Sequence, residues 1–370
     1  MERAVARIDF EAIRANCTRL KRALGEGSEL CAVVKAGGYG HGADDSAAAA
    51  IAGGATRLAV ATAAEAEAIG RRFPHLPLLT MGALTPAEVD VVISAGSEVA
   101  LWREDFRRAL ADRARAHGHP TRVHVKYDTG MGRLGNTNPD EVMALVRACD
   151  DDPNLELAGV WTHFATADEL DDSGFFEEQL GRFEVLAAAV KAEFPGVLAH
   201  AANSAAVLRE PRSHFDMARC GVAIYGLDPF QSDPVEQGLE PALSLRSYVA
   251  DVKRFPAGTS AGYGRTWTAP TDTWVGVVPL GYGDGVRRAL SNNAEVLVAG
   301  RRRPLVGTVS MDNVTVDLGP EGDVEPGAEA VLIGAQGEDR IFAEEVAARL
   351  DTINYEVTCA ISARVPRRAA

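Results

Sequence analysis

Short apolar runs alternate with longer amphipathic stretches over residues 1–230 of this 370-residue chain. In the first amphipathic stretch, Ile13, Cys17, Leu20 and Leu24 recur at helical spacing, and Asp9 before them is a residue type that favours helix N-caps. Another helix start is marked by threonine, proline and glutamate in the order of a capping box. Helices are therefore predicted after Asp9 and over residues 86–94 and 175–194.

The apolar runs between these stretches have the length and composition of buried parallel strands. Eight such units occur within about 230 residues, which is the repeat number and length of a (β/α)8 barrel, the TIM-type α/β fold. A doubly wound parallel sheet is the alternative, although it has no reason to stop at eight units. The predicted strands are residues 30–34, 58–61, 78–81, 99–102, 123–127, 157–162, 198–202 and 217–224.

The pattern changes past Gly226, where two Asp-Pro pairs interrupt the chain and the helical spacing mostly disappears. Short apolar segments bounded by glycine and proline then predominate, which is typical of a β-rich module. We therefore expect two domains, a barrel over residues 1–230 and a β-rich domain over residues 231–370. The second domain is predicted to contain strands at 245–255, 274–280, 294–298, 304–309, 314–317 and 330–333 and a helix at 342–350.

Within the predicted barrel, residues 30–42 end a buried strand in a lysine that is followed closely by four glycines. Lys35 is expected at the C-terminal end of that strand, where barrel enzymes have their active sites. Partial burial there favours the neutral amine, which is a nucleophile toward carbonyl groups. The glycines allow the backbone to approach a ligand closely, although a surface lysine before an ordinary turn is the alternative interpretation.

Composition narrows the possible partners. The net charge of −14 and the absence of a basic run argue against nucleic acid and membrane surfaces, so small-molecule chemistry is expected. The charged N-terminus lacks the apolar core of a signal peptide, and no apolar run has membrane-spanning length, so a cytoplasmic location is expected. Five scattered cysteines without Cys-x-x-Cys spacing indicate neither a disulfide framework nor a zinc site, and no metal is expected.

If the barrel forms, polar residues at the C-terminal ends of its strands converge on one site. The loops after the last two strands, which often bind phosphate in such barrels, contain Ser204 and the backbone amides of Gly221 and Val222. A phosphorylated carbonyl compound beside Lys35 indicates pyridoxal 5'-phosphate, whose aldehyde would form a Schiff base with the lysine. The converging residues are Lys35, Tyr39, Lys126, Arg133, His163, Asn203, Ser204, Arg219 and Gly221.

Nine motifs together resemble those of the alanine racemases, pyridoxal-phosphate enzymes with a barrel and a C-terminal β-domain. Each motif is weak alone, but they occur in order over nearly the whole chain. One departure is that many relatives have Asn and Ala where this chain has Gly37 and Gly38, so cofactor affinity or substrate range can differ. The motifs are AVVKAGGYGHG (32–42), KYDTGMGRLG (126–135), HFATAD (163–168), NSAA (203–206), RCGVAIYG (219–226), AGYGR (261–265), GYGDG (281–285), GTVSMD (307–312) and TINYEVTC (352–359).

The resemblance implies roles for individual residues around the cofactor. Lys35 would bind it covalently, and Arg219 would face the pyridine nitrogen. Because a guanidinium keeps its proton, the ring nitrogen would stay unprotonated and the cofactor would be a weaker electron sink, which suits simple reprotonation. His163 and His200 would support the ring and Arg219, although each could equally be an ordinary barrel histidine. The implied phosphate ligands are Tyr39, Ser204, Gly221, Val222 and Tyr355.

Inverting a stereocentre by proton transfer is simplest with an acid or base on each face of the planar carbanion, and Lys35 can serve only one face. In the family, a tyrosine that matches Tyr263 serves the opposite face. Residues that match Met311 and Asp312 help to close the carboxylate side of the substrate. These residues come from the partner subunit, so the resemblance implies a homodimer.

Two further basic residues have counterparts in the family. Arg133 matches an arginine near the phenolic oxygen of the cofactor, where it would contribute to substrate binding. Lys126 matches a lysine that some members carry as a carbamate, which would turn a repulsive neighbour of Arg133 into an attractive one. The sequence leaves open whether Lys126 is modified.

The resemblance thus implies an isomerase that interconverts L- and D-alanine with pyridoxal phosphate and supplies D-alanine for peptidoglycan. A racemase of the same fold for serine or for several amino acids stays open, because the sequence does not fix the volume of the substrate pocket. A non-catalytic pyridoxal-phosphate-binding protein is a third possibility. The β-domain with Tyr263 and Met311 argues against it, since such a protein needs no second proton donor.

Overall fold

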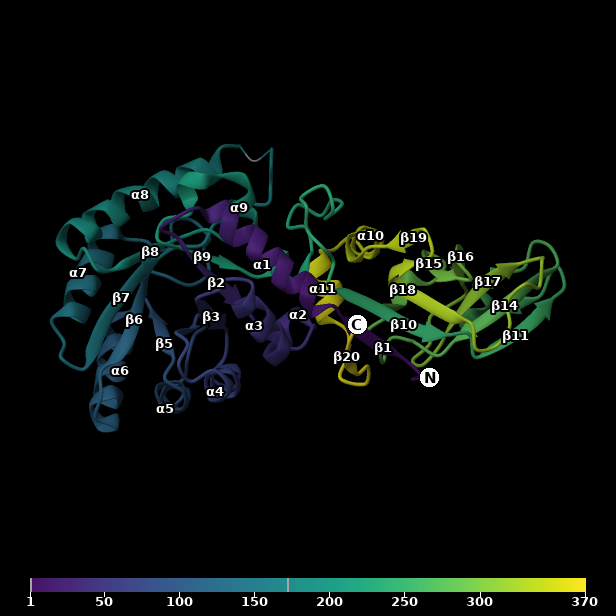
Figure 1. Ribbon diagram of the computed structural model, residues 1–370, viewed down its shortest axis with the longest axis horizontal. Helices are drawn as coiled ribbons and strands as arrows, with labels where there is room; N and C mark the ends of the chain where they lie inside the picture. The colour runs from purple at the N-terminus through teal and green to yellow at the C-terminus, as the bar shows by residue number, and fades with distance from the viewer. Residues whose placement is uncertain (1, 172) are drawn as a thin grey trace. The chain divides into compact units, whose positions relative to one another are not determined.

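The computed structural model describes residues 2–171 and 173–370, which divide into two compact units. The barrel unit comprises Ile13–Gly38 and Ala43–Ile224, and the sheet unit comprises residues 2–12, Tyr39–Gly42 and Tyr225–Ala370 (Figure 1). Among the described residues, none of the helices combines the length and the apolar character that crossing a membrane requires.

Eight parallel strands of the barrel unit form a closed barrel in their order along the chain. This confirms the predicted fold class and excludes the doubly wound alternative. One predicted strand is too long, because the run 217–224 leaves the barrel after Cys220 and turns into a 3-10 helix (η2, Val222–Tyr225) in which Ile224 N–H donates to Gly221 O. The barrel strands are β2 (Glu29–Val33), β3 (Arg57–Val60), β4 (Leu78–Thr80), β5 (Glu98–Leu101), β6 (Thr121–Lys126), β7 (Leu155–Trp161), β8 (Leu198–His200) and β9 (Met217–Cys220).

The helices between these strands begin where local sequence signals place them. Asp9 accepts a hydrogen bond from the N–H of Ala12 at 3.0 Å, which confirms the predicted cap of the first helix. Glu88 accepts the N–H of Thr85 at 2.8 Å, and Pro86 is the first helical residue after it. The helices are α1 (Phe10–Leu24), α2 (Lys35–Tyr39), α3 (Ala43–Ala52), α4 (Ala63–Arg72), α5 (Pro86–Ser94), α6 (Glu104–His117), α7 (Pro139–Asp150), α8 (Phe175–Glu193), α9 (Ser204–Arg209) and the 3-10 turn η1 (Pro211–Ser213).

Part of the interior of the barrel is polar, whereas the layer between barrel and helices is apolar. Side chains alternate between these two environments along each strand. On β6, Val123 and Val125 are fully buried, and His124 and Lys126 on the other side of the strand are buried as well. Buried polar groups need hydrogen-bond partners, so the barrel interior contains a connected polar network rather than a purely apolar core.

The sheet unit is built on a ten-stranded sheet with the order β11-β14-β17-β16-β15-β18-β10-β1-β20, and β19 pairs with β18. The run 245–255, predicted as one strand, is two strands, because Val249 N–H bonds to Ala328 O and Ala250 N–H bonds to Val277 O. The chain therefore changes its partner strand at this point. The strands are β1 (Val5–Ile8), β10 (Leu243–Tyr248), β11 (Asp251–Phe255), β14 (Thr273–Val278), β15 (Ala294–Val298), β16 (Arg301–Val306), β17 (Val314–Gly319), β18 (Glu329–Gln336), β19 (Asp339–Ile341) and β20 (Arg367–Ala369).

Short elements complete the sheet unit. The two terminal strands β1 and β20, for which the sequence predicted no strand, pair in parallel with Ala6 opposite Arg367. The helix predicted over 342–350 is present. The remaining elements are the ribbon β12 (Ser260–Ala261) with β13 (Trp267–Thr268), the helices α10 (Ala343–Arg349) and α11 (Asn354–Cys359), and the 3-10 turns η3 (Tyr263–Arg265) and η4 (Arg288–Leu290).

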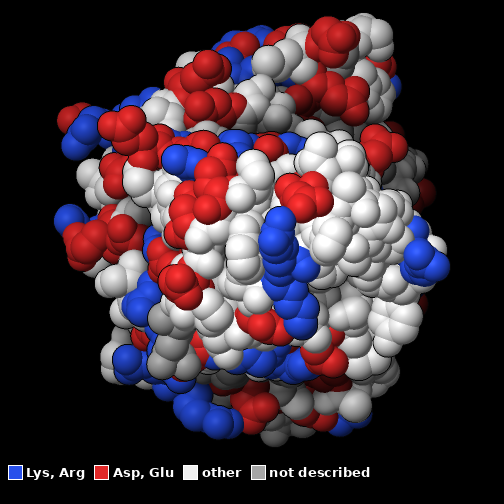
Figure 2. All heavy atoms as spheres, turned by 90° about the vertical axis from the view of Figure 1, so that its right-hand side faces the viewer, with Lys and Arg blue, Asp and Glu red and all other residues white. Residues whose placement is uncertain are grey.

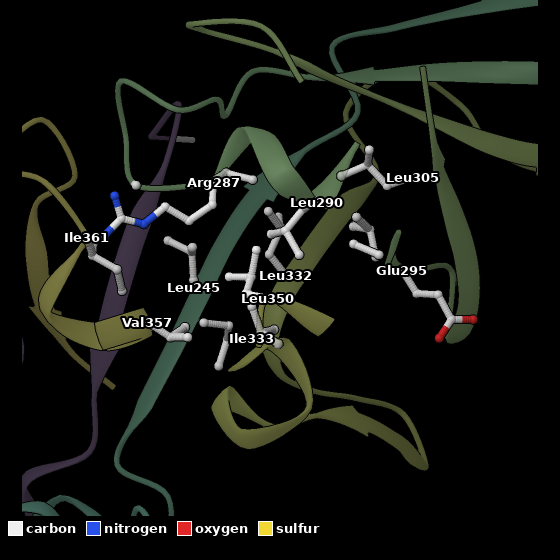
Figure 3. Close-up of a pocket in the computed structure, with 15 residues that line it drawn as sticks. Leu245, Arg287, Leu290, Glu295, Leu305, Leu332, Ile333, Leu350, Val357 and Ile361 are labelled. Atoms are coloured by element: carbon white, nitrogen blue, oxygen red, sulfur yellow. The ribbon is translucent and has the colours of Figure 1, made fainter. Parts of the chain in front are cut away.

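The core of the sheet unit contains a small apolar cavity of about 40 Å³ (Figure 3). Leu245, Leu332 and Val357 are among the apolar side chains that line it, and the charged ends of Arg287 and Glu295 point away from them. One water needs about 10–15 Å³ of such space, so this cavity holds at most a few waters. It is therefore a packing feature of the core and is too small for a metabolite.

The outer face of the sheet unit carries charges of both signs. Figure 2 shows acidic and basic side chains interspersed over this face, with an uncharged area to one side. The sheet unit also contains ion pairs, for example Arg254 with Asp272 at 2.9 Å and Arg302 with Glu345 at 2.7 Å. The pair of Arg254 and Asp272 is exposed, and such pairs contribute little to stability, typically below about 1 kcal/mol.

Candidate active site

Lys35 follows β2 directly and opens a turn of unusual backbone conformation. Ala36, Gly37 and Gly38 have φ angles of 51°, 61° and 65°, and Tyr39 continues the run at 52°. A residue with a Cβ pays roughly 1–2 kcal/mol for this left-handed conformation, which explains the glycines in the middle of the run. The N–H of Ala36 donates to Glu65 at 2.7 Å, so the first residue of the turn is held from α4.

Four basic residues of the barrel unit surround one histidine. Burial and the charges of Arg219, Lys126, Arg133 and Lys35 lower the pKa of His163 well below its usual value. Burial, and then Arg219 and Arg133, lower the pKa of Lys126 to about 8. This concentration of positive charge suits an anionic ligand such as a phosphate or a carboxylate.

Arg219 is almost completely buried, with 4% of its surface exposed. Its Nη1 donates to His200 Nδ1 at 2.8 Å, and its Nη2 donates to the carbonyl oxygens of Thr162 at 2.8 Å and Ala201 at 3.0 Å. The guanidinium carbon lies 4.7 Å from the ring centre of Trp161. Burial lowers the pKa of Arg219 to about 10, so it remains charged at neutral pH. Its Nε–H has no acceptor among residues 2–171 and 173–370, which leaves a donor for a ligand.

Ser204 connects the loops after the last two barrel strands. Its Oγ accepts the N–H groups of Gly221 at 3.1 Å and Ala223 at 3.3 Å, so its own hydrogen must be donated elsewhere. Asn203 caps α9 by accepting the N–H of Ala206 at 2.9 Å. The predicted residues Ser204 and Gly221 are therefore in direct contact, and Val222 follows at the start of η2.

Asp128 shapes the loop that carries Arg133. Its carboxylate accepts the N–H groups of Gly130 at 3.0 Å, Gly132 at 3.1 Å and Arg133 at 3.1 Å. These backbone hydrogen bonds outweigh the effect of burial and lower the pKa of Asp128. The loop is thus fixed by one carboxylate, while the Arg133 side chain stays exposed.

Tyr39 and Tyr355, two of the predicted phosphate ligands, lie together in the sheet unit. Their ring centres are 6.0 Å apart, and Tyr225 lies 5.2 Å from Tyr39. His41 stacks on Tyr225 at 4.6 Å. This aromatic group fixes the ring positions of both tyrosines.

Three sequence motifs of the sheet unit form one surface. Thr308 donates to the carbonyl oxygen of Tyr263 at 2.8 Å, and the N–H of Gly283 donates to Met311 O at 2.9 Å. Arg364 donates to Asp312 at 2.7 Å. Tyr263 is 73% exposed and Met311 is 51% exposed, so both side chains are accessible on this surface.

Sequence analysis missed several residues that contact the predicted site or are connected to it through one other residue. Glu65, Glu98, His124 and Trp161 all belong to this group. The capping-box spacing of Thr62 and Glu65 is a signal that could have pointed to Glu65. The other three lie within strands, and no sequence pattern distinguishes them from ordinary strand residues.

Two family descriptions match most of the chain. The family description "Alanine racemase, N-terminal domain" matches residues 8–229, and "Alanine racemase, C-terminal domain" matches residues 242–369. The chain belongs to the alanine racemase family. It is 43% identical to an alanine racemase of Symbiobacterium thermophilum over 363 residues, which cover 98% of this chain and 96% of the relative. It is 41% identical to alanine racemase 1 of Bacillus subtilis, covering 98% of this chain and 92% of the relative.

Solved structures of the alanine racemase family share the fold over the full chain. The alanine racemase from Streptomyces coelicolor A3(2) superposes with a TM-score of 0.92 at 37% identity, covering 99% of this chain and 98% of the other. An alanine racemase from Bacillus anthracis with bound L-Ala-P gives 0.90 at 36% identity, covering 100% and 95%. The resemblance predicted from the motifs is therefore confirmed at the level of the family.

Proposed function

We propose that this chain interconverts L- and D-alanine with pyridoxal 5'-phosphate and that two copies of the chain form each active site. The observation that carries the proposal is the position of Arg219. A buried guanidinium with a free Nε–H lies among three other basic groups at the C-terminal end of the barrel. This donor set suits an anionic cofactor with an unprotonated ring nitrogen.

The residues present fit such a cofactor in three respects. Arg219 has a donor left for a ring nitrogen and does not give up its proton. Ser204 and Gly221 belong to the loops after the last two barrel strands, where barrels of this type often bind phosphate. The family resemblance adds Val222, Tyr39 and Tyr355 as phosphate ligands.

When bound, pyridoxal phosphate supplies an aldehyde for attachment to a lysine and an electron-withdrawing ring that acidifies the α-proton of an amino acid. Lys35 would hold the cofactor and move a proton at one face of the α-carbon. Tyr263 of the partner subunit would move a proton at the opposite face, which suits the high exposure of Tyr263 on its own chain.

The remaining predicted residues would bind and orient the substrate. Arg133 would donate to the oxygen-rich edge of the cofactor and substrate, and His163 would stay neutral because its pKa is low. Met311 and Asp312 of the partner subunit would close the carboxylate side of the substrate. A neutral imidazole beside a charged guanidinium can accept a hydrogen bond without adding repulsion, and Arg219 Nη2 lies 3.4 Å from His163 Nδ1.

The proposal extends to the cellular role. The five cysteines are scattered without Cys-x-x-Cys spacing, which does not indicate a disulfide framework, and we propose a cytoplasmic location. There the enzyme would supply D-alanine for the cell wall.

The proposal is tested with purified protein loaded with pyridoxal phosphate and incubated with L-alanine in deuterium oxide. We expect loss of the α-proton signal in the NMR spectrum together with formation of D-alanine, measured by chiral chromatography. L-serine in a parallel sample tests the broader racemase. Cofactor binding without α-proton exchange in either sample would indicate a non-catalytic binding protein and would contradict the proposal.

Covalent attachment is tested separately. Borohydride reduction of the loaded protein should fix the pyridoxyl group on Lys35, as shown by peptide mapping. The label on Lys126 or Lys253 would overturn the assignment of Lys35 while leaving racemisation itself unaffected.

A further inference from the structure

A line of four polar residues runs through the interior of the barrel and ends at Arg219. Glu98 is the first residue of β5, and His124 lies in the middle of β6. His200 is the last residue of β8, and Arg219 lies on β9 (Figure 1). Because the strands are parallel, the line begins near the N-terminal end of the barrel and ends near the C-terminal end, where the proposed site lies.

The line is continuous in hydrogen bonds. Glu98 Oε2 is 2.7 Å from His124 Nε2, and His124 Nδ1 is 2.9 Å from His200 Nε2. His200 Nδ1 is 2.8 Å from Arg219 Nη1. Both histidines are fully buried, and Glu98 and Arg219 are each 4% exposed. Water therefore does not compete for these hydrogen bonds, and a defect at one end is not repaired by solvent.

Glu98 and Arg219, at the two ends of the line, allow only one arrangement of the protons on His124 and His200. A guanidinium only donates, so His200 Nδ1 must be an acceptor and His200 must carry its proton on Nε2. That proton is donated to His124 Nδ1, which leaves the proton of His124 on Nε2, where it meets the Glu98 carboxylate. A doubly protonated His124 would force the proton of His200 onto Nδ1, against an Arg219 N–H.

The ring of His124 is held in this position by the neighbouring strand. The pairing of β6 with β7 shifts register between Val123 and His124, so that His124 lies opposite Gly159. A Cβ at Gly159 would lie 2.2 Å from His124 Nδ1. The strand thus leaves room for this imidazole only because a glycine stands there.

The other end of the line carries a fixed negative charge. Burial alone would raise the pKa of Glu98, but the hydrogen bond from His124 and the charges of Arg57 and Arg122 lower it to about 2. Arg57 Nη1 lies 3.1 Å from both carboxylate oxygens, and Arg122 Nη1 lies 3.1 Å from Oε1. Glu98 is therefore ionised at neutral pH, where its carboxylate only accepts hydrogen bonds.

We propose that Glu98 and His124 are positioning residues of the active site, which fix the proton of His200 on Nε2 and so hold the Arg219 guanidinium in one orientation. The inference rests on the proposed function for its catalytic consequence, since Arg219 would then present its free Nε–H to the ring nitrogen of the cofactor. The proton order itself depends on this chain alone. Residues at the N-terminal end of such barrels usually serve stability, so a role for Glu98 in catalysis is not expected from the fold.

The proton order is tested by nitrogen-15 NMR of histidine-labelled protein, both without cofactor and loaded with pyridoxal phosphate. We expect His124 and His200 to be neutral and to carry their protons on Nε2 in both samples. The NMR signals of the two histidines are assigned by comparison with the variants Glu98→Gln and His124→Phe. A proton on Nδ1 of either histidine, or a doubly protonated His124 at neutral pH, would overturn the proposal.

The effect on the site is tested with Glu98→Gln and a matched control, Glu29→Gln. Both carboxylates bind Arg57 at the same end of the barrel, but only Glu98 contacts a histidine. A glutamine at position 98 can donate as well as accept, so the proton order is no longer fixed. We expect mixed tautomers of His124 and His200, an altered absorbance spectrum of the bound cofactor, and kcat lowered on the order of 10-fold with little change in KM. Glu29→Gln should change none of these.

His124→Phe provides a second variant that leaves the ion pairs of Glu98 with Arg57 and Arg122 in place. It removes the acceptor of His200 Nε2, so the NMR signals of His200 should shift and kcat should fall as in Glu98→Gln. Equal losses of kcat in Glu98→Gln and Glu29→Gln would show that Glu98 has a purely structural role. Histidine NMR signals that are unchanged in both Glu98→Gln and His124→Phe would show the same. If the protein fails to racemise alanine at all, the NMR result still decides the proton order, so the two failures are distinguishable.

Discussion

Lys126 is a basic residue of the site whose charge is sensitive to pH near neutrality. Its pKa of about 8 results from burial and from the neighbouring Arg219 and Arg133, and its ammonium lies 4.3 Å from the ring centre of Trp161. About one tenth of the side chain is neutral one unit below that pKa, and about half is neutral at the pKa. Only the neutral amine adds to carbon dioxide, forming an N–C bond and releasing a proton. We therefore predict that Lys126 forms a carbamate, with more of it at about pH 8.5 than at about pH 6.5.

The measurement is carbon-13 NMR of protein in labelled bicarbonate, with Lys126→Gln as the control that lacks the amine. A carbamate signal that persists in Lys126→Gln, or its absence from the wild type at both pH values, would contradict the prediction. The protonated amine of Lys126 is repelled by Arg133, whereas a negatively charged carbamate on Lys126 would be attracted to Arg133.

Among the individual residues of the site, the sequence could predict those at the ends of the strands but not those inside the barrel. Lys35, Ser204 and Arg219 stand where a strand meets a glycine-rich or capping segment, and such positions converge once a barrel is assumed. Glu98 and His124 lie within β5 and β6, and their importance depends on which strands face each other across the closed barrel. The spacing of residues along the chain does not show which strands face each other. The line from Glu98 to Arg219 could therefore be found only in the structure.

At the scale of elements, the turn after Lys35 depends on helix α4. Glu65 accepts the N–H of Ala36 at 2.7 Å, and it also accepts the N–H groups of Ala61 at 2.9 Å and Thr62 at 3.1 Å. We predict that Glu65→Ala destabilises the protein by about 1 kcal/mol through the lost cap. It should also lower racemase activity roughly 10-fold, because the strained turn loses its anchor and Lys35 is no longer held in one position.

Glu88→Ala is the matched control, since Glu88 has the same place in the capping box of α5 and accepts from Thr85 rather than from the turn. Urea unfolding should give similar losses of stability for both variants. Steady-state kinetics and cofactor titration should separate them, and equal activities of the two variants would show that the bond to Ala36 does not position Lys35.

The elements themselves were largely predictable, and the exceptions have physical reasons. The eight barrel strands are buried on both faces and therefore appear as continuous apolar runs. The terminal strands β1 and β20 were missed, because Arg7, Arg367 and Arg368 interrupt their apolar pattern and each is short. The run 217–224 was predicted too long, since apolar composition continues past Cys220 although the backbone turns at Gly221. Composition indicates burial, but it does not distinguish a strand from a buried turn.

At the scale of the whole molecule, the buried histidines predict how stability depends on pH. The pKa values of His163 and His200 are held well below 6.5, first by burial and then by the charge of Arg219. The unfolded chain binds protons at these residues below about pH 6.5, whereas the folded chain does not. The stability contributed by the neutral forms is therefore complete above that pH and is lost as the pH falls. We predict a loss of roughly 1 kcal/mol for each histidine between about pH 6.5 and 5.5.

The measurement is the free energy of unfolding in urea at several pH values and one protein concentration, without cofactor. Histidine NMR titrations of the folded protein provide the control, because His163 and His200 should show no protonation over this range. Stability that is constant down to about pH 5.5 would mean that both residues take up protons in the folded state as readily as in the unfolded chain.

The last prediction concerns the assembly of two chains. Tyr263 and Met311 are exposed on the single chain, at 73% and 51%, and the proposed function places them in the active site of a partner subunit. Lys35→Ala should abolish activity, and Tyr263→Phe should lower it by roughly 10²–10⁴-fold, the usual effect of losing a positioned acid or base. Each mutant homodimer then lacks one of the two groups in every site.

Mixing the two variants under conditions of subunit exchange separates a shared site from one formed within a single chain. A heterodimer has one site in which both groups are missing and one that combines wild-type Lys35 with wild-type Tyr263 of the partner subunit. Activity should therefore return to at most about half of the wild-type value per heterodimer, because proton transfer on both faces needs both groups in one site. In a site formed within one chain, each site of the mixture still lacks one group, so activity stays at the level of the parents. Exchange is followed independently by the masses of differently tagged dimers, and exchange without recovery would place Tyr263 within its own chain.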